Sequence, residues 1–197
     1  MEQKIIWYSY LSTRHYWLVG LGIIAIFAIT LWVMGQVPIC KCGYIKLWHG
    51  IVASSENSQH ISDWYSFSHI IHGFAFYLLF WKFGRRWPIG LRLMAALLLE
   101  TSWEIFENTD FTINRYREVT ISREYYGDSV VNAIWDVLFM VFGFLLAWRL
   151  PVKATVALLI FMEVFVGYFI RDNLTLNIIM LIYPFESILR WQTGAYP

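Results

Sequence analysis

The sequence predicts an all-α, polytopic membrane helix bundle with about six transmembrane helices. Of its 197 residues, 58% are hydrophobic, 19% aromatic and only 15% charged, whereas a soluble domain carries about 25% charged residues. A membrane-spanning helix needs roughly 17 to 25 mostly apolar residues. Six such windows fit one integral membrane domain over residues 1–197, at about 16–34, 64–81, 88–106, 129–148, 154–170 and 174–189.

The six windows differ in how cleanly apolar they are. The first contains no charged side chain, and the second is interrupted only by His69 and His72. The third and fourth are each apolar in one half and acidic toward the other end. The fifth contains Glu163, while the last is short and carries Pro184 and Glu186. We therefore expect the last span to be kinked or partly re-entrant.

Basic residues in the short loops predict the orientation, because cytoplasmic loops are enriched in Lys and Arg. One side holds nine of them, with Glu2 as the acidic companion: Lys4, Arg14, Lys82, Arg85, Arg86, Arg92, Arg149, Lys153 and Arg190. The other side holds six: Lys41, Lys46, Arg115, Arg117, Arg123 and Arg171. Both termini are therefore predicted to be cytoplasmic.

The charge balance argues against a nucleic-acid partner. The chain carries 15 Lys and Arg against 14 Asp and Glu, so it lacks the positive field that attracts nucleic acid. Its two cysteines, Cys40 and Cys42, are too close to bridge distant segments. With His49 and His60 they could form an external thiolate–imidazole metal site, although C-x-C here has no second matched pair.

Ionisable residues inside the predicted spans carry the main functional signal, because each costs about 2.5 to 3.5 kcal/mol at mid-bilayer. Helical spacing places them in one stripe on each of three spans. The stripes are His69 and His72 on the second span, Glu100, Glu104 and Glu107 on the third, and Asp128, Asn132 and Asp136 on the fourth. In the predicted topology all of them fall in the outer half of the membrane, where we expect them to meet.

Five carboxylates in one place cannot all stay ionised, since like charges repel and burial penalises charge. Protons, arginines or a metal must neutralise them. In the metal hypothesis a Zn²⁺ or other first-row divalent ion activates a water. The predicted ligands are His69, His72, Glu100 and Asp128. The predicted catalytic carboxylates are Glu104, Glu107 and Asp136. The residues predicted to hold an anionic headgroup are Arg115, Arg117, Arg123 and Asn132.

Less specific hypotheses explain the same residues. Arg115, Arg117 or Arg123 could fold down from the external loop and pair with the acids, leaving an ion-paired structural core. The acids could also remain hydrated at the helix ends. The alternative function is therefore a non-catalytic membrane binding or assembly subunit with a membrane-protein partner. A proton-coupled transporter is weaker, since the cytoplasmic halves of the third and fourth spans hold no acids.

The second to fourth spans resemble VanZ-like membrane proteins. The resemblance rests on residues 69–80 (HIIHGFAFYLLF), the acidic third span, and residues 127–136 (GDSVVNAIWD). The matching positions are His69 or His72, Glu100 or Glu104, Arg123, Asp128, Asn132 and Gly143. The whole chain is also similar to bacterial inner-membrane proteins without an assigned activity. These resemblances imply a bacterial inner-membrane location and a lipid-linked or envelope substrate, and the predicted topology would make the site face the periplasm.

Overall fold

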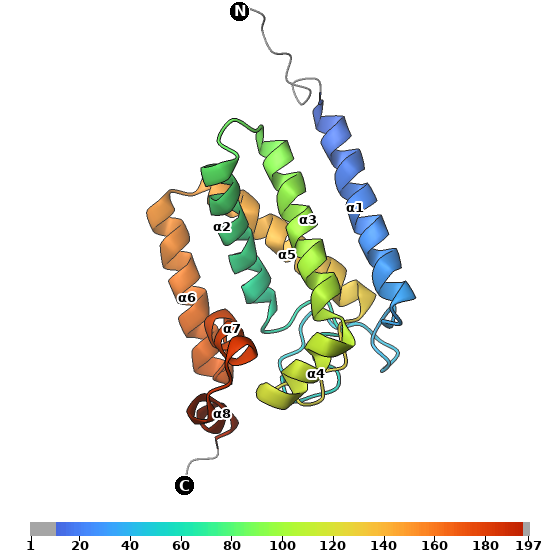
Figure 1. Cartoon of the computed structure of the whole chain (residues 1–197), viewed down its shortest axis with the longest axis vertical. Coiled ribbons are helices and arrows are strands. Elements are labelled where there is room, and N and C mark those ends of the chain that lie inside the picture. The colour runs from blue at the N-terminus through green and yellow to red at the C-terminus, as the bar shows by residue number, and fades with distance from the viewer. Residues whose placement is uncertain (1–10, 195–197) are drawn as a thin grey trace, which may run out of the picture.

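The structure, a computed structural model, describes residues 11–194, which form eight α-helices (Figure 1). The helices are α1 (Thr13–Val33), α2 (Ser66–Phe83), α3 (Ile89–Glu107), α4 (Asp110–Val119), α5 (Val130–Arg149), α6 (Val152–Ile170), α7 (Leu174–Ile182) and α8 (Glu186–Thr193). The all-α prediction is confirmed. Glu2 and Lys4, which entered the orientation argument, lie outside the described residues.

Three helices, α1, α5 and α6, are long and apolar enough to cross a membrane. Large apolar side chains are exposed along α1 and α6, among them Trp17, Ile26 and Phe161, so these helix faces suit contact with lipid. α2 and α3 are 18 and 19 residues long, but their polar and charged side chains make them less apolar. Their predicted membrane crossing therefore stays a prediction.

The sixth predicted span, residues 174–189, is divided between two short helices at the proline where a kink was expected, and its membrane crossing stays a prediction. α7 has 9 residues and α8 has 8. A helix of that length rises only about 14 Å, less than half of a bilayer core of about 30 Å. Pro184 explains the break, since the residue before a proline avoids helical geometry, and Tyr183 is extended at φ −144° and ψ 104°.

The two short helices, α7 and α8, lie at one end of the bundle (Figure 1). Figure 1 places α7 and α8 beside the C-terminal end of α6, at the same end as α4; we call this the loop end. α1 begins at the opposite end, which differs from the expectation that both termini share one side. With Arg190 moved to the loop end, the nine-to-six distribution of basic residues becomes eight to seven, so loop charge no longer favours one orientation.

Two glycines set the close crossing of α2 and α5. A Cβ atom at Gly73 would lie 2.2 Å from the Met140 carbonyl oxygen, and one at Gly143 would lie 2.1 Å from the Ile70 carbonyl oxygen. The backbone of each helix therefore rests directly on the other, as small residues allow between membrane helices. This contact fixes the polar first turns of α2 against those of α5.

Glu163, an isolated acid of α6, positions α7. Its carboxylate oxygens accept the backbone N–H groups of Leu174 and Thr175, each at 3.1 Å. The Asn173 side chain caps the same helix start by accepting the Leu176 N–H at 2.8 Å. These bonds satisfy donors that have no partner within the helix. α7 is thereby held in place as one wall of the cavity described below.

The segment between α1 and α2, residues 34–65, forms no helix and packs on the start of α5; we call it the first loop. The Gln59 side-chain amide donates to the Gly127 carbonyl at 2.7 Å, and the Ser129 hydroxyl donates to the Gln59 carbonyl at 3.0 Å. The Asn132 side-chain amide donates to the His60 carbonyl at 2.8 Å. The first loop therefore covers the loop end as a hydrogen-bonded layer.

A buried carboxylate, Asp172, ties the turn between α6 and α7 to its surroundings. It accepts the Tyr65 hydroxyl at 3.0 Å and the side-chain amides of Asn177 and Gln192 at 3.1 and 3.0 Å. Burial raises the pKa of Asp172 from 3.8 to about 6, although these donors favour the carboxylate and oppose the shift. The folded protein therefore holds this proton more tightly than the unfolded chain.

We expect ionisation of the Asp172 carboxyl to lower the stability of the fold as the pH rises from about 4 to about 6. The protonated Asp172 contributes fully to the free energy of unfolding below pH 3.8, the pKa of the unfolded chain. This contribution is lost as the pH rises through the pKa of the folded protein, and the loss amounts to about 3 kcal/mol at about 1.36 kcal/mol per pKa unit. Asp172→Asn should remove this part of the slope, whereas the exposed control Asp110→Asn should keep it. Thermal unfolding in detergent across this pH range measures the effect, and equal slopes in both variants would contradict it.

Candidate metal centre

A buried group of imidazoles and carboxylates lies where α2 faces α3 near the loop end. We call it the His/Glu cluster and define it as His69 and His72 of α2 with Glu100 and Glu104 of α3. His69 is 7% exposed and both glutamates are 0% exposed. Each pair is separated by about one helical turn, which directs the two side chains to the same face. The sequence stripes of the second and third spans therefore meet here.

Short contacts join the four side chains. His69 Nδ1 donates to Glu100 Oε1 at 2.8 Å, and His72 Nδ1 donates to the same carboxylate, at 3.2 Å from Oε1 and 3.1 Å from Oε2. His69 Nδ1 also lies 3.3 Å from Glu104 Oε1. One carboxylate thus receives two imidazoles, while neither oxygen of Glu104 has a hydrogen-bond partner in the described chain.

These separations fit the ligand shell of a divalent ion. His69, His72 and Glu100 each offer a ligand atom, and the three atoms lie within 4.8 Å of one another. In a tetrahedral zinc site with bonds of 2.0 to 2.1 Å, neighbouring ligand atoms are about 3.3 Å apart. Glu104 is not among these three ligands, but its Oε1 lies 3.3 Å from His69 Nδ1 and both of its oxygens are buried without a hydrogen-bond partner among the described residues, which calls for an explanation. An ion at this place would replace the two Nδ1 protons.

Asp136 and Glu107 lie next to the His/Glu cluster. Asp136 Oδ1 is buried without a hydrogen-bond partner among the described residues, and it lies 3.9 Å from Nε2 of His69. Glu107 accepts the hydroxyl of Tyr116 at 2.7 Å. Both residues line the cavity described below. Asp136 therefore presents an unpartnered oxygen next to the cluster, as Glu104 does within it.

Asp128 lies at the cavity wall and has partners of its own. It accepts the Asn108 side-chain amide at 2.7 Å and the Tyr125 hydroxyl at 3.1 Å, and its backbone N–H donates to Asn108 Oδ1 at 2.7 Å. It is not in the group of candidate ligand atoms formed by the histidines. Sequence reasoning missed Asn108 and Tyr125. The Tyr-Tyr-Gly-Asp run that ends at Asp128 was the available signal for the tyrosine.

The residues predicted to hold a headgroup do not line the cavity. They are Asn132, Arg115, Arg117 and Arg123. Asn132 is bound to the first loop, and the Arg115 guanidinium donates to the Leu181 carbonyl at 3.0 and 3.1 Å. Arg117 donates to the Tyr125 carbonyl, and Arg123 is exposed. Over residues 11–194 no ion pair joins these arginines to the acids, so the ion-paired core is not found.

A cavity of about 630 Å³ lies beside the His/Glu cluster. The two histidines and Asp136 line its polar side. Most of its apolar lining comes from α3 and α7: Leu99, Trp103, Phe106, Leu174, Ile178, Leu181 and Ile182. Phe106 and Ile178 are each 47% exposed and Ile182 is 77% exposed. The cavity therefore reaches the protein surface through an apolar face between α3 and α7.

A family model described as "Protein of unknown function (DUF2585)" matches residues 31–194. The chain belongs to this family. It is 55% identical over 179 residues to a UPF0314 protein of Sinorhizobium fredii, covering 90% of this chain and 91% of the relative. A UPF0314 protein of Paracoccus denitrificans is 52% identical over 179 residues, covering 91% and 92%. No solved structure matches the chain.

The family match corrects the resemblance to VanZ-like proteins, which is wrong. The DUF2585 match includes the first loop and α6 to α8, which lie outside the segments that suggested VanZ. The segments that suggested VanZ have in common with that family only a histidine or an acidic residue on an apolar helix. Any membrane helix bundle with a buried polar site contains such residues. A lipid-linked substrate must therefore be supported by the cavity itself.

Proposed function

We propose that this protein is a metal-dependent membrane hydrolase or transferase that acts on a lipid-linked amphiphile. The observation that carries the proposal is that His69 and His72 line a largely apolar cavity, with the buried carboxylates of Glu100 and Glu104 behind them and both oxygens of Glu104 without a hydrogen-bond partner among the described residues. His69, His72, Glu100 and Glu104 would hold a first-row divalent ion, which supplies an activated water at neutral pH.

The remaining residues of the cavity take supporting roles in this proposal. Asp136 is the general base, because its unpartnered Oδ1 faces the cluster and a base must reach the proton it removes. Glu107 and Asp128 are held by tyrosine hydroxyl groups, so they shape the polar wall. Among the described residues no arginine lines the cavity, and the anionic part of a substrate would therefore be neutralised at the metal.

The shape of the cavity supports an amphiphilic substrate. Its volume of about 630 Å³ lies within the roughly 300 to 1,000 Å³ typical of small-molecule sites. The exposed apolar rim of Phe106, Ile178 and Ile182 offers a lateral entrance for an acyl or isoprenoid chain. The headgroup would then lie against the His/Glu cluster while the chain remains in the lipid.

The proposal is tested with the purified protein in vesicles made from a bacterial total lipid extract. With Zn²⁺ present, we expect release of a water-soluble headgroup, detected by mass spectrometry and abolished by a chelator. Asp136→Asn should lower the rate at least about 100-fold, within the range for loss of a general base. The matched control Asp110→Asn changes an exposed aspartate of α4 and should keep the full rate.

Two results would contradict the proposal: no headgroup release with any first-row ion, or release at the full rate from a folded Asp136→Asn protein. A protein that binds the ion and releases no headgroup would support the alternative of a non-catalytic membrane binding subunit.

A further inference from the structure

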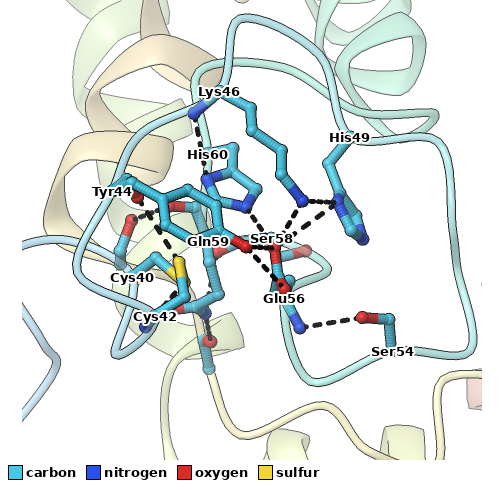
Figure 2. The surroundings of a disulfide bond; sticks show 12 residues. Cys40, Cys42, Tyr44, Lys46, His49, Ser54, Glu56, Ser58, Gln59 and His60 are labelled. Carbon is cyan, nitrogen blue, oxygen red and sulfur yellow. Dashed lines mark hydrogen bonds and ion pairs between the residues drawn. A yellow bond between two sulfur atoms is a disulfide. The ribbon is translucent and has the colours of Figure 1, made fainter.

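A second group of metal-ligating side chains lies in the first loop, separate from the His/Glu cluster. Cys40 and Cys42 form a disulfide bond there, beside Glu56 and His60 (Figure 2). Each of these four residues offers a ligand atom, and the four atoms lie within 4.8 Å of one another. Cys40 and His60 are buried, whereas Cys42 is partly exposed. Two sulfurs, an imidazole and a carboxylate form a donor set suited to zinc.

Hydrogen bonds hold the group in place. Glu56 accepts the Lys46 ammonium at 2.5 Å, His60 Nε2–H at 3.1 Å and the Tyr44 hydroxyl at 3.0 Å. The Tyr44 ring stacks on the His60 ring at a centroid distance of 5.8 Å. Figure 2 shows these side chains converging on Glu56 next to the sulfur atoms. The imidazole and the carboxylate are therefore already oriented toward the cysteines.

We propose that Cys40, Cys42, Glu56 and His60 form a zinc site that opens when the disulfide is reduced and closes when it forms again. This inference stands apart from the proposed hydrolase function, because it involves other residues. A bonded disulfide has no thiolate to offer, so the oxidised loop cannot bind the ion through sulfur. Zinc binding and the disulfide therefore exclude each other.

The reaction balances with a dithiol as reductant. The dithiol breaks the Cys40–Cys42 bond by thiol–disulfide exchange, becomes a disulfide itself, and passes two electrons and two protons to the cysteines. Zinc binding then releases two protons as two sulfur–zinc bonds form. Cys42 is the more exposed of the two cysteines. The Cys42 backbone N–H donates to Cys40 Sγ at 3.1 Å.

Charge is balanced in both states. In the oxidised loop, the Lys46 ammonium neutralises the Glu56 carboxylate. In the zinc-bound loop, two thiolates and one carboxylate carry three negative charges, which Zn²⁺ and Lys46 together neutralise. If zinc binds His60 Nε2, the ring proton lies on Nδ1. His60 Nδ1 can then no longer accept the hydrogen bond from the backbone N–H of Lys46, which is 3.3 Å long in the oxidised loop.

The test compares zinc bound by the wild-type protein before and after reduction. The protein is reduced with a phosphine, freed of reductant without oxygen, dialysed against Zn²⁺ and measured by elemental analysis. We expect the reduced protein to bind one equivalent more than the oxidised protein. Because the His/Glu cluster is the same in both samples, its zinc content cancels. With Co²⁺, the reduced sample should show a thiolate-to-cobalt charge-transfer band that the oxidised sample lacks.

Variants assign the extra ion to this group. Cys42→Ser and His60→Gln should each abolish the extra equivalent, whereas His49→Gln should keep it. His49 is the matched control because it is a buried histidine of the same loop, 5.3 Å from His60 between ring centroids, and is not one of the four ligands. Equal zinc in reduced and oxidised wild-type protein would overturn the proposal, as would a full extra equivalent in His60→Gln.

Discussion

Gly143→Ala should destabilise the protein by about 3 kcal/mol, at the upper end of what extra volume in a packed core costs. The added methyl group would lie 2.1 Å from the Ile70 carbonyl oxygen, 2.9 Å from the Ile70 carbonyl carbon and 3.0 Å from its Cα. All three neighbours are backbone atoms of α2, which cannot rotate away as a side chain can. α2 and α5 must therefore separate. Thermal unfolding in detergent measures the loss.

Gly73→Ala should have the same effect from the other helix, since its Cβ would lie 2.2 Å from the Met140 carbonyl oxygen. Gly22→Ala is the matched control. Gly22 lies inside α1, and a Cβ there meets nothing within 4 Å, so alanine should leave the stability unchanged or raise it slightly through its helix propensity. Equal stability of Gly143→Ala and Gly22→Ala would show that the close crossing is not required.

The long helices could be predicted from sequence because apolar composition and length decide them. The predicted windows 16–34 and 88–106 correspond to α1 and α3 within a few residues. The stripe on α3 was also predictable, since the four-residue spacing of Glu100 and Glu104 depends only on helix geometry. Adjacent helices joined by a short loop lie side by side, and this brought the histidines of α2 to the same carboxylates.

The sixth predicted window is divided into two helices, and composition alone does not indicate where the first of them ends. Residues 174–189 are apolar enough on average, but Pro184 ends α7, and Gln192 turns α8 back to the buried carboxylate of Asp172. The hydrogen-bond partners of Asp128 could not be predicted from the sequence either. Asn108 follows α3 directly, and Tyr125 belongs to an irregular segment, whose contacts depend on tertiary folding rather than on any period in the sequence.

Replacing both histidines of the His/Glu cluster should have the largest effect on metal binding. His69→Ala/His72→Ala removes two of the four proposed ligands, so zinc affinity should fall by at least about 100-fold, beyond the 10- to 100-fold that residues behind the ligands contribute. His15→Ala/His49→Ala removes the same number of imidazoles away from the cluster and should keep the affinity. His15 is exposed on α1, and His49 lies in the first loop.

The direct test is the zinc content of these two variants and of the wild type, purified without reductant so that the Cys40–Cys42 disulfide stays closed. The wild type and the His15→Ala/His49→Ala protein should each retain one equivalent of zinc after dialysis, and the His69→Ala/His72→Ala protein should retain none. Zinc bound equally by both double variants, or absent from a folded wild type dialysed against it, would contradict a metal centre between α2 and α3.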